Sequence, residues 1–311
     1  MVAALVYVVG MRIALGMAAL GRPAYINLGR DTALPADRTV EAMRAASFEV
    51  LDAAYAAGIR WVDAARSYGR AEEFVAAWLA DRGVTDVTVS SKWGYEYTAD
   101  WRPDAEVHEV KEHSLARFER QWTETRALLE VGLYQVHSLT GDSPLFTDRD
   151  LQARMADIGV PVGFSTSGPA QVDTIRRAFD IEVGGRRLFS SVQSTFNLLE
   201  TSAGPALAEA HAEGARVMLK EVMANGRLAM RPPGPVADIA LRHGVGPDAV
   251  AMAGALAQPW ADLVLSGAAS VAQLYANLMP VHLDTADHEM LRDLAEPPGQ
   301  YWATRSALTW T

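Results

Sequence analysis

The sequence contains no cysteine in its 311 residues. Disulfide frameworks, thiolate metal centres and cysteine nucleophiles are therefore excluded as explanations of how this protein is held together or how it works. A chain without cysteine is compatible with a reducing compartment, and we expect the protein to be cytoplasmic.

Long apolar runs are also missing, because no window reaches the roughly 18 uninterrupted apolar residues that a membrane-spanning helix requires. Residues 1–9 are apolar but form a short run without a basic segment before it, and Arg12 follows. We expect an upstream extension or a first strand there rather than a signal peptide.

Basic residues are in the minority, and the formal net charge is −10. Nucleic acid and anionic membrane are therefore not expected as partners, because both require a basic face. A small-molecule substrate remains compatible with this charge, since a local basic pocket can lie inside an acidic protein.

Short β-like runs alternate along the chain with amphipathic helical segments. Strands are predicted at 12–16, 60–63, 87–91, 133–136, 160–164, 188–192, 215–219 and 263–265. Helices are predicted by apolar residues at helical spacing, with Asp37 as the first N-cap and Gly58 and Gly83 as stops. They cover 40–54, 71–81, 115–129, 172–179, 206–212, 236–242, 248–257 and a segment from Ser270.

This alternation is typical of parallel βαβ units, so the predicted fold class is α/β. Eight such units close a (β/α)8 TIM barrel, and residues 1–311 are predicted to form one such domain. An open doubly wound sheet is the alternative, but the spacing from Gly16 to Gly21 does not match a dinucleotide-binding glycine motif. Both folds place the functional site at the carboxyl ends of the strands.

Ionisable side chains stand at the ends of three successive predicted strands. Asp63 ends one strand, Lys92 follows the next, and His137 follows the third, while Tyr68 lies in the loop after Asp63. Neighbouring parallel strands are about 4.8 Å apart, so these side chains can meet over one barrel mouth. A single charged residue at a strand end commonly marks only where the chain meets water, but this grouping favours a site.

Several motifs around these residues match one known family. They are Gly58-Ile59-Arg60-Trp61-Val62-Asp63 leading to Ser67-Tyr68-Gly69, Ser91-Lys92, Leu133-Tyr134-Gln135-Val136-His137, Gly163-Phe164-Ser165, Val192-Gln193-Ser194, Ala224-Asn225-Gly226-Arg227-Leu228 and Ser266-Gly267-Ala268. The set Asp63, Tyr68, Lys92 and His137 is specific, whereas the glycine-containing pieces are weak alone. Over nearly its whole length the chain thus resembles the aldo-keto reductase family. The resemblance implies NAD(P)-dependent carbonyl chemistry on a (β/α)8 barrel, catalysed by Asp63, Tyr68, Lys92 and His137.

The chemistry of carbonyl reduction suits these residue types. Hydride arriving at carbon places negative charge on the carbonyl oxygen, and Tyr68 can give that oxygen a proton. Because a free phenol has a pKa of about 10, we expect the Lys92 ammonium to lower the pKa of Tyr68. Asp63 can hold Lys92 in place, and a neutral His137 can donate a hydrogen bond to the substrate oxygen. The reverse reaction uses Tyr68 as a phenolate base.

The resemblance further implies that NAD(P)H is the cofactor. Ser165 and Gln193, with Thr166 beside them, would hold the nicotinamide carboxamide, since together they offer a donor and an acceptor. Lys220 stands where many relatives have an aromatic residue stacked on the nicotinamide, so either another aromatic or the stem of Lys220 fills that place. The other implied cofactor contacts are Gly16, Met17, Val222, Gly226, Leu228, Gly267, Ala269, Gln273 and Asn277.

The loops 220–228 and 266–277 follow the last two predicted strands, where barrel enzymes often bind phosphate. Ser270 and Gln273 fit a capping box, which is compatible with a plain helix cap or with a helix N-terminus that receives phosphate. Gly267, Ala268 and Gln273 occupy positions where NADP-preferring relatives usually carry basic residues. We therefore hypothesise that NADH serves at least as well as NADPH, and the choice between them stays open.

Aromatic residues flank the predicted mouth. Trp93 and Tyr95 follow Lys92, and Trp302 lies in the C-terminal tail with Trp310. They are candidates for the wall of a substrate pocket that takes a carbonyl compound or a sugar, although they can equally pack the tail onto the barrel.

The leading hypothesis is an oxidoreductase that interconverts an aldehyde, ketone or sugar lactol or lactone with an alcohol. A redox-sensing, cofactor-binding partner subunit with slow turnover is the alternative. A metal-dependent barrel enzyme is a weaker third option, because only Asp63, Glu221 and His137 would be available as ligands, and we predict no metal site. The sequence leaves the substrate, the preferred direction and the oligomeric state open.

Overall fold

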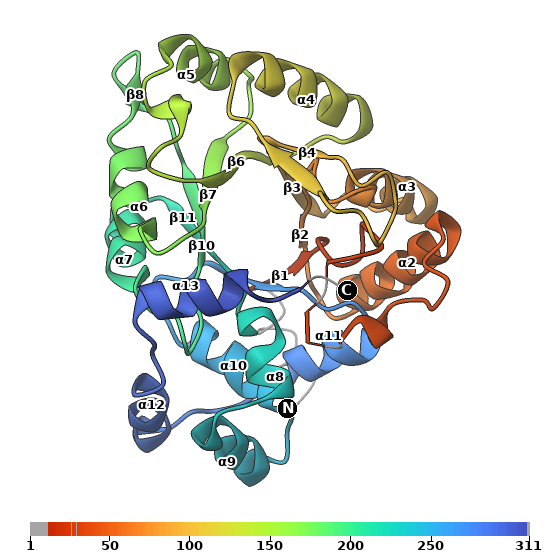
Figure 1. The fold of residues 1–311 in the computed structure, drawn as a ribbon, viewed down its shortest axis with the longest axis vertical. Coiled ribbons are helices and arrows are strands. Elements are labelled where there is room, and N and C mark those ends of the chain that lie inside the picture. Colours follow the sequence, from red (N-terminus) through yellow and green to blue (C-terminus); the bar gives the residue numbers. More distant parts are fainter. Residues whose placement is uncertain (1–11, 26, 29, 310–311) are drawn as a thin grey trace.

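The computed structural model describes residues 12–309, apart from residues 26 and 29. In this part of the chain, eight parallel strands close into a barrel, in the spatial order β1-β2-β3-β6-β7-β10-β11-β12 and back to β1 (Figure 1). They are β1 Ile13–Gly16, β2 Trp61–Asp63, β3 Thr88–Trp93, β6 Leu133–Leu139, β7 Val162–Thr166, β10 Ser191–Thr195, β11 Arg216–Lys220 and β12 Leu263–Ser266. The predicted (β/α)8 barrel is thereby confirmed.

The helices of the described residues are α2 Val40–Ala56, α3 Ala71–Arg82, α4 Leu115–Leu128, α5 Arg149–Ala156, α6 Gln171–Phe179, α7 Gly204–Ala212, α8 Arg227–Met230, α9 Gly234–His243, α10 Pro247–Leu256, α11 Val271–Leu278, α12 Thr285–Arg292 and α13 Pro298–Ser306. Most helices lie around the outside of the barrel, while α9 and α12 lie farther from it (Figure 1). Because helices cover the barrel from outside and side chains fill it from inside, strands such as β7 and β10 are buried along their whole length.

Several boundaries differ from the sequence-based expectation, and two of these differences have a clear structural cause. Thr39, not Asp37, caps α2, since its hydroxyl accepts a hydrogen bond from the Ala42 amide at 3.2 Å. The strand expected at 188–192 begins three residues later as Ser191–Thr195. Phe189 packs instead against Phe164, with the ring centroids 4.8 Å apart. The most apolar part of this segment therefore leads into the strand, while small polar residues form it.

Several elements were not anticipated. An antiparallel hairpin, β4 Tyr95–Tyr97 and β5 Glu109–Lys111, interrupts the segment after β3, and a second hairpin pairs β8 Glu182–Val183 with β9 Arg186–Arg187. Short 3-10 turns cover η1 Arg30–Ala33, η2 Pro144–Phe146 and η3 Ala224–Gly226. Helices α5, α8, α12 and α13 were also unexpected, and α13 crosses the rim of the barrel opening in Figure 1.

The predicted extension or strand at residues 1–9 and the tail residue Trp310 lie outside the described residues. Among the helices that are described, none is long and apolar enough to cross a membrane.

Candidate active site

A cavity opens at the carboxyl ends of the barrel strands. Most of the residues predicted from the sequence to bind cofactor or substrate or to act in catalysis lie on its wall, although they come from widely separated parts of the chain. The nominated residues on its wall are Gly16, Asp63, Tyr68, Tyr95, His137, Gln193, Lys220, Val222, Gly226, Gly267, Gln273 and Asn277.

Lys92, near the end of β3, connects the carboxylate and the phenol of the site. Its side-chain nitrogen forms an ion pair with Asp63, donates to the Ala64 carbonyl oxygen at 3.0 Å and lies 3.5 Å from the Tyr68 hydroxyl. Lys92 and Asp63 are both almost completely buried. A buried ammonium requires such a partner, because an isolated charge would be very costly to remove from water.

Asp63 is held by more than the ion pair. One of its carboxylate oxygens accepts hydrogen bonds from Ser90 at 2.7 Å and from the side-chain amides of Gln135 and Gln193, each at 3.1 Å. Gln193 was expected to hold a nicotinamide carboxamide, and in this structure its amide nitrogen is directed at Asp63. These bonds fix the carboxylate at the end of β2 and, through it, Lys92.

His137 stands beside Tyr68 at the cavity wall. The two rings meet edge to face with centroids 5.4 Å apart, and the Nδ1 atom of His137 lies 3.3 Å from the Ser67 hydroxyl. Burial and the positive charges of Lys92 and Arg22 hold the pKa of His137 well below its usual value. The imidazole is therefore neutral at pH 7, with one ring nitrogen as donor and the other as acceptor.

The acidity of Tyr68 differs from the sequence-based expectation. Burial and the negative charge of Asp63 raise the pKa of Tyr68 above its ordinary value, whereas the Arg22 guanidinium lowers it. The expected net lowering of the pKa is therefore wrong for this structure, because burial, assisted by the charge of Asp63, outweighs the nearby positive charge. Tyr68 is a neutral phenol near pH 7, which is the form that can donate a proton.

Arg22 is a cavity residue that the sequence reasoning missed. It is 1% exposed, and its guanidinium carbon lies 4.0 Å from the ring centroid of Tyr25 and 5.1 Å from that of Tyr68. It donates to the carbonyl oxygens of Ala18 and Ser67, each at 3.2 Å, and pairs with the Glu109 carboxylate at 3.0 Å. Its position just after β1, at the end of the barrel that carries the site, was the available signal.

A second missed group connects the tail to the cavity. Glu221 has a left-handed backbone at φ 56°. Its carboxylate accepts a bifurcated hydrogen bond from the Nε of Arg305 on α13, at 3.0 and 3.1 Å, and another from the Nη2 atom at 2.5 Å. The Lys220 amine lies 3.7 Å from Glu221 and donates to the Thr195 hydroxyl at 2.8 Å. Because Glu221 pairs with these cations and Asp63 pairs with Lys92, the carboxylates that a metal site would need are engaged in ion pairs.

Burial and the charges of the neighbouring groups together set the pKa values of this group. It lowers the pKa of Lys220 to about 8, even though the neighbouring Glu221 acts in the opposite direction. Burial alone would raise the pKa of Glu221, but the charges of Lys220 and Arg305 outweigh it and lower that pKa to about 2. At pH 7 the group therefore remains charged, with Lys220 closer to its titration point than an exposed lysine would be.

Some nominated cofactor residues are buried but do not lie on the cavity wall. Ser165 accepts a hydrogen bond from the Ser138 amide at 2.8 Å, and Thr166 shares one with Ser194 at 2.7 Å. The remaining members of this set are Met17, Leu228 and Ala269.

One end of the cavity lies at the start of α11, where Gln273 and Asn277 line it. Ser270 caps this helix by accepting from the Gln273 amide at 3.3 Å, and the Gln273 side chain accepts from the Ala269 amide at 3.0 Å rather than closing a capping box. Asn277 donates to the Ser266 hydroxyl at 2.9 Å, while its buried side-chain oxygen has no partner among the described residues. That oxygen is a ready acceptor for an amino group of a bound ligand.

The nominated substrate aromatics divide into two groups. Tyr95 lies on the cavity wall, 4.9 Å from the His137 ring, and burial raises its pKa to about 12. Trp93 is completely buried and packs against Phe118, with centroids 4.9 Å apart. Trp302 is buried beside Tyr301. Neither tryptophan lies on the cavity wall.

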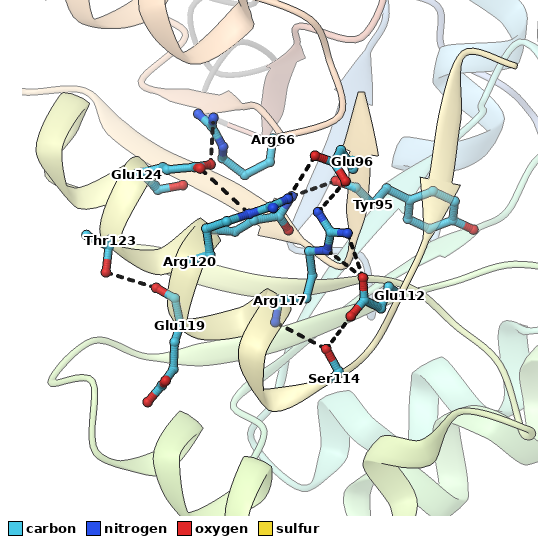
Figure 2. A network of polar contacts seen from close by, with 12 residues as sticks. Arg66, Tyr95, Glu96, Glu112, Ser114, Arg117, Glu119, Arg120, Thr123 and Glu124 are labelled. Carbon is cyan, nitrogen blue, oxygen red and sulfur yellow. Dashed lines mark hydrogen bonds and ion pairs between the residues drawn. The ribbon is translucent and has the colours of Figure 1, made fainter. Parts of the chain in front are cut away.

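The β4–β5 hairpin, which carries Tyr95 and Glu109, is fixed to α4 by a network of ion pairs shown in Figure 2. Glu96 on β4 pairs with Arg117 at 2.6 Å and with Arg120 at 2.9 Å, and Arg117 also pairs with Glu112 at 2.6 Å. Individual exposed ion pairs contribute little, but a network on a partly buried arginine restricts where the hairpin can lie.

A closed parallel barrel whose mouth combines a phenol, an ammonium, a carboxylate and a neutral imidazole defines a barrel enzyme of the carbonyl–alcohol oxidoreductase class. The model of the Aldo/keto reductase family matches residues 12–296. The chain therefore belongs to this family.

Solved structures agree on the fold. The glycerol dehydrogenase AKR11B4 from Gluconobacter oxydans superposes with a TM-score of 0.65 at 18% identity, covering 91% of this chain and 90% of that one. The aldo-keto reductase AKR11C1 from Bacillus halodurans, in its holo form, gives 0.65 at 20% identity and 92% of each chain. The search of curated proteins found no match.

Proposed function

We propose that this protein is an NAD(P)-dependent oxidoreductase that interconverts a carbonyl and an alcohol, with Tyr68 as the general acid and base. The observation that carries the proposal is the position of the Tyr68 hydroxyl, 3.5 Å from the Lys92 amine, in a ring that meets His137 edge to face. Family membership supports the same reaction class.

Each residue has a defined task in this mechanism. In carbonyl reduction Tyr68, a neutral phenol, donates its proton to the substrate oxygen, and Lys92 stabilises the phenolate that remains. Asp63 holds Lys92, and neutral His137 donates a hydrogen bond that orients the carbonyl. In alcohol oxidation the same phenolate removes the proton.

The bound nicotinamide would accept or deliver the hydride. We assign its binding to the cavity wall from Gly16 through Gln193 and Lys220 to the loop at Gly267. The partnerless acceptor of Asn277 and the open backbone at Gly267 fit the polar nucleotide end of such a cofactor. The substrate is an aldehyde, a ketone or a sugar lactol or lactone bound beside Tyr95 and His137.

The test is the Tyr68→Phe variant, assayed against a panel of carbonyls and sugars. We expect turnover to fall by about 10² to 10⁴, with NADH and NADPH binding, measured by fluorescence titration, unchanged. Tyr55→Phe, which removes an exposed hydroxyl bonded to Asp86, is the matched control and should keep full activity. Activity of Tyr68→Phe within tenfold of the native enzyme, or cofactor binding without turnover on any substrate, would contradict the proposal.

A further inference from the structure

Two cations lie close to the ring of Tyr68. The Lys92 nitrogen is 4.9 Å from the ring centroid, and the Arg22 guanidinium carbon is 5.1 Å from it. The ion pair between Lys92 and Asp63 is shielded from solvent, because both side chains are at most 2% exposed. The partner of Arg22 is different, since the Glu109 side chain is 20% exposed and comes from the β4–β5 hairpin rather than from the barrel.

Arg22 also joins the two loops that present the phenol. Its guanidinium bonds the carbonyl oxygen of Ser67, the residue before Tyr68, and that of Ala18 in the loop after β1. Those loops touch backbone to backbone, and a Cβ on Gly21 would lie 2.3 Å from the Tyr68 carbonyl oxygen. The Arg70 amide donates to the Gly21 carbonyl oxygen at 2.8 Å. The guanidinium thus ties the loop after β1 to the loop that carries Tyr68, and these contacts restrict the Tyr68 backbone.

The hairpin completes this arrangement. Glu109 on β5 fixes the guanidinium, while Glu96 on the paired strand β4 is tied to Arg117 and Arg120 of α4, as Figure 2 shows. A chain of ion pairs and one strand pairing therefore connects helix α4 with the phenol through Glu109 and Arg22.

We propose that Arg22 is a positioning residue for the proton transfer, one that holds the ring of Tyr68 in place and supplies the positive charge that favours its phenolate, with Glu109 as the counter-charge that moderates it. The inference rests on the proposed function, because it concerns the proton carried by Tyr68.

The charges that face Tyr68 determine in which direction each substitution shifts the titration of its phenol. Lys92 and Asp63 approach from β3 and β2, Arg22 from the loop after β1, Glu109 from β5 and Glu221 from the end of β11, while His137 on β6 is neutral. Removing Arg22 takes away a cation, and removing Glu109 takes away an anion. The two halves of one ion pair should therefore move the titration of Tyr68 in opposite directions.

The experiment compares Arg22→Gln and Glu109→Gln in the full-length enzyme, measuring kcat/KM for alcohol oxidation between about pH 6 and 10. This reaction needs the phenolate, whose fraction rises with pH throughout this range because the pKa of Tyr68 is raised. We therefore expect Arg22→Gln to move the rising limb to higher pH by about one unit, which is seen as a kcat/KM about tenfold lower at each pH. Glu109→Gln should move it to lower pH, and Arg22→Lys should recover part of the native profile. Glu109 is partly exposed, so Glu109→Gln is expected to fold even if Arg22→Gln does not. Its shift to lower pH then tests the inference by itself.

Arg176→Gln and Glu209→Gln provide the matched control, since they break an Arg–Glu pair between α6 and α7, far from the phenol in the sequence and outside the cavity wall. Both should retain the native pH profile. If the Arg22 and Glu109 variants lose activity equally and their pH profiles do not shift in opposite directions, Arg22 has only a structural role. That result would overturn this inference and leave the proposed function standing. A native enzyme whose turnover does not need Tyr68 would overturn the proposed function together with it.

Discussion

The side-chain nitrogen of Lys92 lies 3.5 Å from the hydroxyl oxygen of Tyr68, and the same nitrogen forms an ion pair with Asp63. The ammonium is thus shared between the Asp63 carboxylate and a phenol that, in the proposed mechanism, becomes a phenolate. Burial and the negative charge of Asp63 raise the pKa of Tyr68, which keeps the phenol protonated and able to donate.

Replacing Lys92 tests whether its charge serves stability, catalysis or both. Lys92→Met leaves the buried Asp63 without its cation, and we expect the free energy of unfolding to fall by about 3–5 kcal/mol. The double variant Lys92→Met with Asp63→Asn should recover most of that stability and none of the turnover. Urea unfolding and kcat measure the two effects, and a double variant with near-native kcat would refute the catalytic role of Lys92.

Two buried histidines predict how stability depends on pH. Burial is the main cause that lowers the pKa of His113, to about 4, and that of His137 well below its usual value. As pH falls below about 6.5, the unfolded chain binds protons at these sites and the folded protein does not, so stability is lost with acidification at about 1.4 kcal/mol per pH unit for each histidine.

Denaturant unfolding at pH 7, 6 and 5 measures this loss. His113→Gln should remove the part of the slope that belongs to His113, whereas replacing the exposed His282 with Gln should leave the slope unchanged. Equal slopes in native protein and His113→Gln would contradict the prediction.

The Arg305–Glu221 ion pair predicts that α13 is part of the site rather than a loose tail. Arg305→Met leaves a buried carboxylate at the cavity, so we expect a loss of about 3 kcal/mol and earlier proteolytic cleavage near α13. Adding Glu221→Gln should restore resistance to protease. If the single variant is cleaved no faster than the native protein, other contacts hold the helix.

The last loop of the barrel predicts the choice of nucleotide. Gly267, Gln273 and Asn277 line its end of the cavity and none is cationic, so a 2′-phosphate would lack a charged partner there. We expect kcat/KM with NADH to equal or exceed that with NADPH. Gln273→Arg should raise the NADPH value, and a native preference for NADPH of about a hundredfold or more would show that another cation binds the phosphate.

Much of the fold followed from local patterns. Every barrel strand was foreseen, because short β-rich runs between helices of regular spacing allow few topologies. The hairpin β4–β5 was not foreseen, since Tyr95–Tyr97 and Glu109–Lys111 are three residues each and pair only across a long turn. The shift of β10 arose because the apolar pair Leu188–Phe189 could equally fill a strand or the core beside it.

The part of the site that was predicted from the sequence is the part whose residues lie at or next to the ends of the barrel strands. Asp63, Lys92 and His137 lie at or near the ends of three neighbouring strands, and Tyr68 lies in the loop after the first of them, so closing the barrel brings them to one rim. Arg22 and Arg305 gave no comparable signal, because each meets the site through partners that are far away in the sequence, such as Glu109 and Glu221.

The sequence alone therefore determined the barrel, the family and the four strand-end groups, because these depend on local periodicity and on the rule that parallel strands end at a common rim. The tertiary structure decided the protonation state of Tyr68, the pairing of Arg22 with Glu109 and the position of Trp93 and Trp302 away from the cavity wall. Those properties depend on burial and on the distances between charges, which exist only once the chain is folded.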